Sequence, residues 1–264
     1  MRVEDSTSPA YGDLVTTGIV VLPIGAIDGH GPHLPLSSDT IISTHLAHRL
    51  ESYFDVLVLP AIPYGLKTDP PASGGEFPGA INLRASTLTN VVLDVLRASY
   101  RNGARRFLIL DSHMANLGAV RESVHLFMEN APDARVMSVM WWDVVSEDTR
   151  NQIAEETGVS RQDDHHAAMV ETSLVMHIAP NSVRHDLVAD DGIARRARYL
   201  ILPVPESLKT RTGVVYRASR ASAAIGERLV NEMVANLVEA VKLELTWAVP
   251  YFHSLGPQIT QIDS

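Results

Sequence analysis

The sequence has 264 residues, of which 45% are hydrophobic and 20% are charged, a composition typical of a folded globular protein. Its 31 acidic and 22 basic residues give a formal net charge of −9, which argues against binding along a nucleic-acid backbone. Cysteine is absent, so any transition-metal site must be built from histidine and carboxylate side chains. The N-terminal segment is polar and no apolar stretch approaches the length of a membrane span. We therefore expect a cytoplasmic protein that binds neither nucleic acid nor a membrane.

Short apolar runs alternate with longer amphipathic segments, which predicts a mostly parallel sheet with helices on both faces. The expected strands cover residues 18–24, 55–61, 105–110 and 134–142, and the expected helices cover 40–54, 88–102, 116–130, 166–178 and 219–246. The sequence contains no repeat or linker, so residues 1–264 are expected to form a single domain. The Gly/Pro-rich stretch 62–79 is long for a connection in a compact domain, and we expect it to shape a site.

The loop after the first expected strand, residues 23–39, carries Asp28, His30 and Asp39. Residues two apart in an extended segment point the same way, so Asp28 and His30 would face a common point. Asp39 follows at the expected start of a helix, where Ser38 or Asp39 is a candidate N-cap. One imidazole and two carboxylates suit a divalent cation. The alternative is a turn with a surface Asp and His, followed by an N-cap.

His113 lies just past the end of the expected strand 105–110. Sites in open parallel sheets form outside the carboxyl ends of the strands, and the loop that carries Asp28 also follows a strand end. Two strand ends therefore bring metal-ligand residue types to one edge of the sheet. The alternative is that His113 caps the backbone of the helix that follows.

The segment DDHHAAMVETS, residues 163–173, precedes and enters an expected helix. His166 and Glu171 are five residues apart, which is about 140° around a regular helix. They share one face only if His166 precedes the first regular turn. The alternative is an acidic cluster that complements the helix dipole.

Together these segments resemble the creatininase (creatinine amidohydrolase) family. Residues 23–39 are similar to the family pattern PxGSxEQHGPHLPLxxD, residues 111–116 to NGHGGN or NGHxEN, and residues 166–174 to HAGxxETSL. The resemblance implies a three-layer α/β/α fold with a mostly parallel sheet and a divalent metal centre of one or two ions. It also implies hydrolysis of non-peptide C–N bonds and a homo-oligomer, often a hexamer.

Site residues are also implied by the resemblance, position by position. They are the metal ligands Asp28, His30, Asp39 and His113, with Asp39 bridging, and the catalytic pair His166 and Glu171. Two positions depart from the pattern: Asp28 stands where the family has Glu, and Ala115 stands where NGHxEN supplies a further Glu ligand. A second ion would then have His30, Asp39 and water, unless another acidic or histidine side chain contributes. The candidates for that contribution are Asp163, Asp164 and His165.

We therefore predict a metal-dependent amidohydrolase of a small molecule that carries an amide, cyclic amide or formamide. Zn²⁺, with Mn²⁺ and Fe²⁺ as alternatives, would activate a water, Glu171 would transfer protons and His166 would stabilise the oxyanion. Trp142 ends an expected strand at the same sheet edge and is expected to contact the substrate. One alternative is hydrolysis of a C–C bond in a cyclic ketone by the same centre. Another is a catalytically weak subunit with a structural or interaction role.

Overall fold

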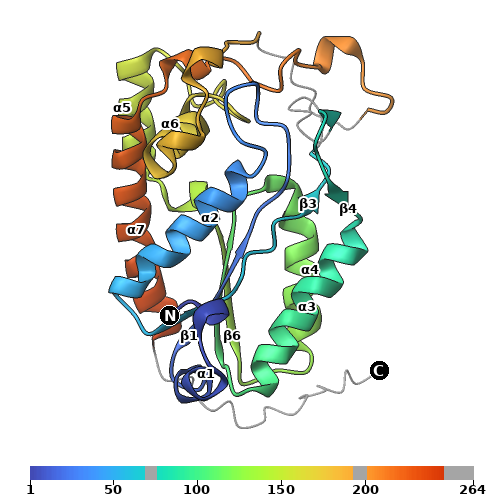
Figure 1. Cartoon of the computed structure of the whole chain (residues 1–264), viewed down its shortest axis with the longest axis vertical. Helices are drawn as coiled ribbons and strands as arrows, with labels where there is room; N and C mark the ends of the chain where they lie inside the picture. The colour runs from blue at the N-terminus through green and yellow to red at the C-terminus, as the bar shows by residue number, and fades with distance from the viewer. Residues whose placement is uncertain (69–75, 193–200, 247–264) are drawn as a thin grey trace, which may run out of the picture.

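A four-stranded parallel sheet runs through the middle of the protein (Figure 1). The structure is a computed structural model that describes residues 1–68, 76–192 and 201–246, so part of the predicted loop 62–79 lies outside the described residues. In sheet order the strands are β2 (Val56–Val58), β1 (Ile19–Ile24), β5 (Arg106–Asp111) and β6 (Arg135–Met140), and each neighbouring pair is parallel. Two short strands, β3 (Gly65–Leu66) and β4 (Asn82–Leu83), form a separate parallel pair. The predicted parallel sheet is confirmed.

Helices cover both faces of this sheet (Figure 1). In the described residues they are α1 (Ser8–Val15), α2 (Ser38–Arg49), α3 (Ala85–Arg101), α4 (Leu117–Met128), α5 (Glu147–Thr157), α6 (Met169–Ile178) and α7 (Ala223–Leu245). Helices α2, α6 and α7 pack on one face, and α3 and α4 pack on the other. The result is the three-layer α/β/α arrangement. Among the described residues, no helix combines the length and the apolar character needed to cross a membrane.

Strand β1 is buried along its whole length and its side chains alternate between two cores. Ile19 and Val21 join the core under α2, α6 and α7, whereas Val20 and Leu22 join the core under α3 and α4. Successive side chains on a strand point to opposite faces. A continuous apolar run is therefore what a strand covered on both faces requires.

The predicted elements agree with the structure at their centres and differ at their ends. Helix α2 begins at Ser38 and has Ser37 at its N-cap, so the predicted N-cap at Ser38 or Asp39 is wrong and Asp39 lies in the first turn. Helix α6 begins at Met169, which leaves His166 ahead of it. Strand β6 ends at Met140, and the predicted strand residue Trp142 lies instead in a 3₁₀ helix, η5 (Trp141–Val144).

Helices α6 and α7 approach each other closely at Gly226. A Cβ atom at this position would lie 2.0 Å from the carbonyl oxygen of Ser173 and 2.9 Å from the Cβ of His177. The two helices are also joined by a hydrogen bond of 3.1 Å from the Ser222 amide to Ser173 Oγ. Helix α6 carries Glu171, so this contact sets where that carboxylate lies.

Replacing Gly226 with alanine is expected to force α7 away from α6 and to lower the free energy of unfolding by about 1–3 kcal/mol. Gly118→Ala is the matched control, because a Cβ on that helical glycine meets nothing within 4 Å. The control is expected to be neutral or slightly stabilising, since alanine favours a helix over glycine. Urea unfolding of both variants measures the difference, and equal stabilities would contradict this account of the packing.

Candidate metal centre

Six side chains predicted from the sequence lie together at the carboxyl edge of the sheet. They come from the loop after β1, the first turn of α2, the loop after β5, and the start of α6, and they are Asp28, His30, Asp39, His113, His166 and Glu171. None of them exposes more than 11% of its side chain to solvent. Ionisable groups this deeply buried require compensating partners.

Asp39 stands at the centre of the cluster. Helix α2 passes close over the end of β1 at Gly25, where a Cβ would lie 2.4 Å from the amide nitrogen of Thr40. This approach places Asp39 Oδ1 3.3 Å from His30 Nε2 and Asp39 Oδ2 2.9 Å from His113 Nδ1. Each carboxylate oxygen of Asp39 therefore faces a different histidine.

Main-chain carbonyl groups orient the three histidines. The distances are 3.1 Å from His30 Nδ1 to the oxygen of Asp28, 2.8 Å from His113 Nε2 to that of Leu66, and 2.7 Å from His166 Nε2 to that of Gly29. A carbonyl oxygen only accepts hydrogen bonds, so each of these ring nitrogens carries a proton. In a neutral imidazole the other nitrogen then has a lone pair, and in all three residues that nitrogen faces the carboxylates. Metal-binding histidines are oriented by the same kind of hydrogen bond.

Charges within the cluster shift the pKa values strongly. Burial lowers the pKa of His30, but Asp39 and Glu171 outweigh it and raise that pKa to about 10. Burial likewise opposes protonation of His113, but Asp39 and Asp28 raise its pKa to about 9. Burial raises the pKa of Asp39, but His30 and His113 hold it well below its usual range. In the metal-free protein these protons balance the buried carboxylates, and a bound cation would displace them.

His166 lies just before α6 and faces Glu171, with 4.0 Å between His166 Nδ1 and Glu171 Oε2. Between them Ala167 has a left-handed φ of 53° and donates its amide to Glu171 Oε2 at 2.6 Å. The sequence spacing of His166 and Glu171 allows them to face each other only if His166 precedes the first turn of the helix. The left-handed backbone at Ala167 places His166 in that position. Burial, assisted by the positive charge of His30, lowers the pKa of His166 to about 4, and burial raises the pKa of Glu171 to about 7.

Asn116 was not singled out from the sequence, yet it joins three strand ends. It is fully buried, and its Nδ2 donates to the carbonyl oxygen of Gly25 at 3.2 Å and to Asp111 Oδ1 at 3.1 Å. Its Oδ1 accepts from the Leu66 amide at 2.9 Å, and Asp111 Oδ1 also accepts from the His113 amide at 3.0 Å. Asn116 closes the motif DSHMAN, so its place in that motif was the available signal.

Asp28 is held by groups on two segments. Its Oδ1 accepts from the Gly29 amide at 2.8 Å, and its Oδ2 accepts from Thr68 Oγ1. Its Oδ2 also lies 4.0 Å from His113 Nδ1. Thr68 is 40 residues away in the sequence, and no local pattern marked it.

A cavity of about 640 Å³ opens over the cluster and reaches Asp39, His113 and Glu171. Trp142, predicted to contact substrate, lines this cavity, and so does its neighbour Trp141. Their rings meet edge to face with centroids 5.2 Å apart. A concave site with apolar walls and convergent polar groups is typical of small-molecule binding.

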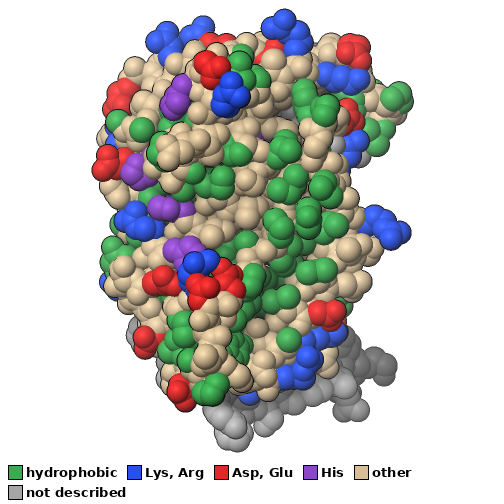
Figure 2. Space-filling model, in the orientation of Figure 1, with side chains coloured by type: hydrophobic (Ala, Val, Ile, Leu, Met, Phe, Trp, Pro, Cys, Tyr) green, Lys and Arg blue, Asp and Glu red, His purple; other side chains and the backbone are tan. Residues whose placement is uncertain are grey.

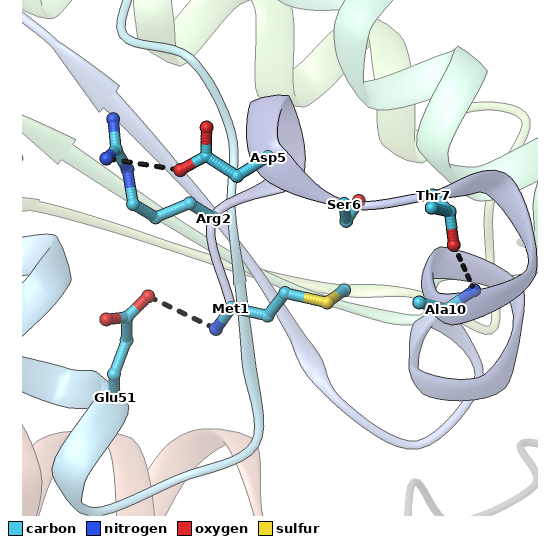
Figure 3. A pocket seen from close by; sticks show the side chains of 7 residues that line it. All are labelled: Met1, Arg2, Asp5, Ser6, Thr7, Ala10 and Glu51. Carbon is cyan, nitrogen blue, oxygen red and sulfur yellow. Dashed lines mark hydrogen bonds and ion pairs between the residues drawn. The ribbon is translucent and has the colours of Figure 1, made fainter.

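A second hollow, near the start of the chain, has no comparable chemistry (Figure 3). It is lined by Met1, Arg2, Asp5, Ser6, Thr7, Ala10 and Glu51. Its charged groups pair with one another, Arg2 with Asp5 at 3.2 Å and the Met1 amino group with Glu51 at 3.1 Å. The cavity over Asp39 is therefore the better candidate for a reaction site.

Comparison with known proteins identifies the family. The family model described as creatininase, creatinine amidohydrolase, matches residues 4–241. The chain belongs to the creatininase family. As a member of this family it is a metal-dependent amidohydrolase, and the family predicted from the three motifs is confirmed.

Creatininase relatives are similar over most of the chain. The creatinine amidohydrolase of Pseudomonas putida is 29% identical over 250 residues, which cover 92% of this chain and 96% of that protein. The mycofactocin precursor peptide peptidase of Mycolicibacterium smegmatis is 27% identical over 236 residues, 85% and 84% of the two chains. A solved structure of creatininase with manganese has a TM-score of 0.86 at 28% identity, covering 92% and 97% of the two chains. Another creatininase structure is of a Zn-Zn type, so creatininase structures carry manganese or zinc.

His33 lies beside the cluster and titrates in the acid range. It is fully buried, and its Nε2 lies 2.8 Å from Thr172 Oγ1. Burial and the positive charge of His30 lower the pKa of His33 to about 4, below its ordinary value of 6.5. Between pH 6.5 and pH 4, His33 binds a proton in the unfolded chain but not in the folded protein. Protonation therefore favours the unfolded chain, and the free energy of unfolding decreases as the pH falls.

The His33→Gln variant is expected to lack this acid sensitivity. On going from pH 7 to pH 5 the unchanged protein should lose about 1–2 kcal/mol more unfolding free energy than the variant. Urea unfolding of both proteins at the two pH values measures the difference. An equal loss in both proteins would show that His33 is not the titrating group.

Proposed function

We propose that the chain hydrolyses the C–N bond of an amide in a small molecule, using a divalent metal held at the carboxyl edge of the sheet. The observation that carries this proposal is the convergence of a ring nitrogen from each of three histidines on buried carboxylates beneath a cavity of about 640 Å³. Nitrogen and oxygen donors without sulfur suit Zn²⁺, Mn²⁺ or Fe²⁺.

The proposed metal ligands are Asp28, His30, Asp39 and His113. His113 Nδ1 lies 2.9 Å from Asp39 Oδ2 and 4.0 Å from Asp28 Oδ2, so both carboxylates face the same ring nitrogen. His30 Nε2 is buried 3.3 Å from Asp39 Oδ1 and 3.8 Å from Glu171 Oε2, where a bound cation would take the place of its proton. A divalent cation at such a site polarises a carbonyl oxygen and lowers the pKa of a bound water towards ~7.

Protein groups must then carry a proton from the attacking water to the leaving nitrogen. His166 donates its Nε2 proton to the carbonyl of Gly29, so its Nδ1, on the side of the cluster, carries no proton. This supports a role for His166 as a proton acceptor at Nδ1 in place of the oxyanion donor expected from the sequence. Once protonated, the same nitrogen can pass the proton to the departing amine.

Cavity size and apolar walls support a compact substrate with a planar group. Trp141 and Trp142 offer flat apolar surface to such a group, and an amide within a ring meets this description. The relatives similar in sequence include a creatinine amidohydrolase and a mycofactocin precursor peptide peptidase, so a linear amide is the second candidate substrate class.

We also propose that the chain forms a homo-oligomer, as the family resemblance implies. Figure 2 shows hydrophobic side chains gathered over the middle of one face, with many charged side chains towards its rim. Large apolar side chains that expose a third or more of their surface include Leu36, Tyr64, Ile81 and Val91. Exposed apolar surface of this kind supports an interface between subunits.

Removal of the metal with a chelator is expected to abolish hydrolysis, and Zn²⁺ or Mn²⁺ should restore it. The assay uses a cyclic amide, a formamide, a short peptide and a cyclic diketone, with products identified by mass spectrometry. Cleavage of an amide supports the proposal, whereas cleavage of the diketone alone would favour C–C bond hydrolysis. Full activity after verified metal removal would refute the metal-assisted mechanism.

The His166→Ala variant is expected to lower kcat on the order of 100- to 10,000-fold, because a positioned proton acceptor is lost. Its metal content, measured by mass spectrometry of the elements, should equal that of the unchanged protein. His125→Ala, which changes an exposed histidine on α4, is the control and should keep both activity and metal. Loss of metal from His166→Ala would assign that histidine to the metal instead.

A further inference from the structure

We propose that Arg150 binds a carboxylate group of the substrate, so that the protein acts on amides that carry a negative charge away from the bond that is cleaved. Arg150 lies on α5 and lines the same cavity as residues of the candidate metal centre. This inference adds a substrate class to the function proposed above and rests on it.

Main-chain carbonyl groups hold one edge of the Arg150 guanidinium. Its Nε donates to the carbonyl oxygen of Val145 at 3.2 Å, and its Nη2 donates to that of Trp142. A guanidinium is planar and has five N–H donors, and the remaining donors of Arg150 have no partner among the described residues. Adjacent N–H groups held in one plane match the two oxygens of a carboxylate. The main-chain hydrogen bonds therefore orient the guanidinium before a ligand binds.

Three acidic side chains act on Arg150 from a distance, and each bonds to another group. Glu147 pairs with Arg161. Asp143 and Glu232 each accept a hydrogen bond from a main-chain amide. Burial, followed by the positive charge of Arg161, outweighs the three carboxylates and lowers the pKa of Arg150. An anion supplied by a ligand would therefore stabilise this partly buried cation.

Two further carboxylates line the cavity without pairing with Arg150. Asp163 Oδ2 accepts from Ser160 Oγ at 2.6 Å. Asp164 accepts from the amide of Val170, and burial raises the pKa of Asp164 to about 7. In the part of the chain that the structure describes, no ion pair joins either carboxylate to Arg150. One unpaired cation matches the single charge of a carboxylate better than the nearly doubled charge of a phosphate monoester.

A single small molecule can reach both Arg150 and the candidate metal centre. The cavity of about 640 Å³ is lined by Arg150, Trp142, His113 and Glu171 among others, and pockets of roughly 300–1,000 Å³ are typical for small ligands. Trp142 also carries the carbonyl group that Arg150 binds. A substrate with its amide at the metal, its planar part against Trp142 and its carboxylate on Arg150 would make all three contacts.

The test measures the binding of paired probes to the Zn²⁺-loaded protein by titration calorimetry. Each pair is an amide with a carboxylate and the same amide with a carboxamide in its place, namely hippurate with hippuramide and 5-oxoproline with 5-oxoprolinamide. The carboxylate member is expected to bind about 10- to 100-fold more tightly, as hydrogen bonds to a charged group imply. For a probe that is cleaved, the ratio of kcat/KM values takes the place of the ratio of Kd values.

The Arg150→Met variant is expected to lose this preference, because it keeps a long apolar side chain without the charge. Arg150→Lys keeps the charge but lacks the planar pair of donors, so it should keep part of the preference. Arg228→Met is the matched control. Arg228 is also a partly exposed arginine, but it pairs with Glu156 at 2.8 Å and lies outside the residues that line the cavity, so this variant should keep the full preference.

The ratio within a pair separates recognition of the carboxylate from a purely structural role of Arg150. Loss of the hydrogen bonds to Val145 and Trp142 would weaken the binding of both members alike, whereas loss of recognition weakens only the charged member. If Arg150→Met fails to fold, diffraction from the unchanged protein with the carboxylate probe decides the question. The carboxylate is then expected within about 3.2 Å of Arg150 Nη1.

The outcomes separate this inference from the proposed function. Equal binding of both members, or binding of neither, in every pair would overturn the role of Arg150. A preference that survives in Arg150→Met would also overturn it, because the carboxylate would then bind the metal or another group. Failure of the Zn²⁺-loaded protein to cleave any amide, charged or neutral, would refute the proposed function, whereas a binding preference that depends on Arg150 would still stand.

Discussion

Burial of three carboxylates at one point is the constraint on which the rest of the site depends. Asp28, Asp39 and Glu171 are almost completely removed from water, and each needs a positive partner there. In the metal-free protein, protons on His30 and His113 meet this need, which is why their pKa values rise to about 10 and 9. A bound divalent cation would replace those protons and would turn a stabilising charge pair into a centre that acts on substrate.

The layered fold makes such burial attainable, because it brings rigid elements to one edge. Strands β1 and β5 end side by side, and α2 reaches over them at Gly25. Helix α6 is held against α7 at Gly226, which keeps Glu171 in place. Asn116 then joins the strand ends by hydrogen bonds. A site built on packed strands and helices holds its ligands more accurately than one built on loops.

Much of this arrangement was predictable, because the relevant signals are local. Buried strands read as continuous apolar runs, and β1, β5 and β6 were expected close to where they lie. Helix α1 was missed because it is short, and α5 because its sequence is mostly polar and lacks a strong apolar stripe. Strands β3 and β4, with two residues each, leave no periodicity to detect. Trp142 was placed on a strand because the chain stays apolar past Met140, whereas the backbone turns there into a 3₁₀ helix.

By itself the sequence determined the α/β class, the family and the residue types that meet at the edge of the sheet, since each depends on patterns within one segment. Only the tertiary structure decided which nitrogen of each histidine faces the carboxylates. That choice depends on carbonyl groups distant in the chain, such as Leu66 for His113 and Gly29 for His166, 47 and 137 residues away. The tertiary structure also decided that Glu171 lies beside His30. Distances between side chains of separate segments depend on how the segments pack, and the spacing of residues within one segment does not determine them.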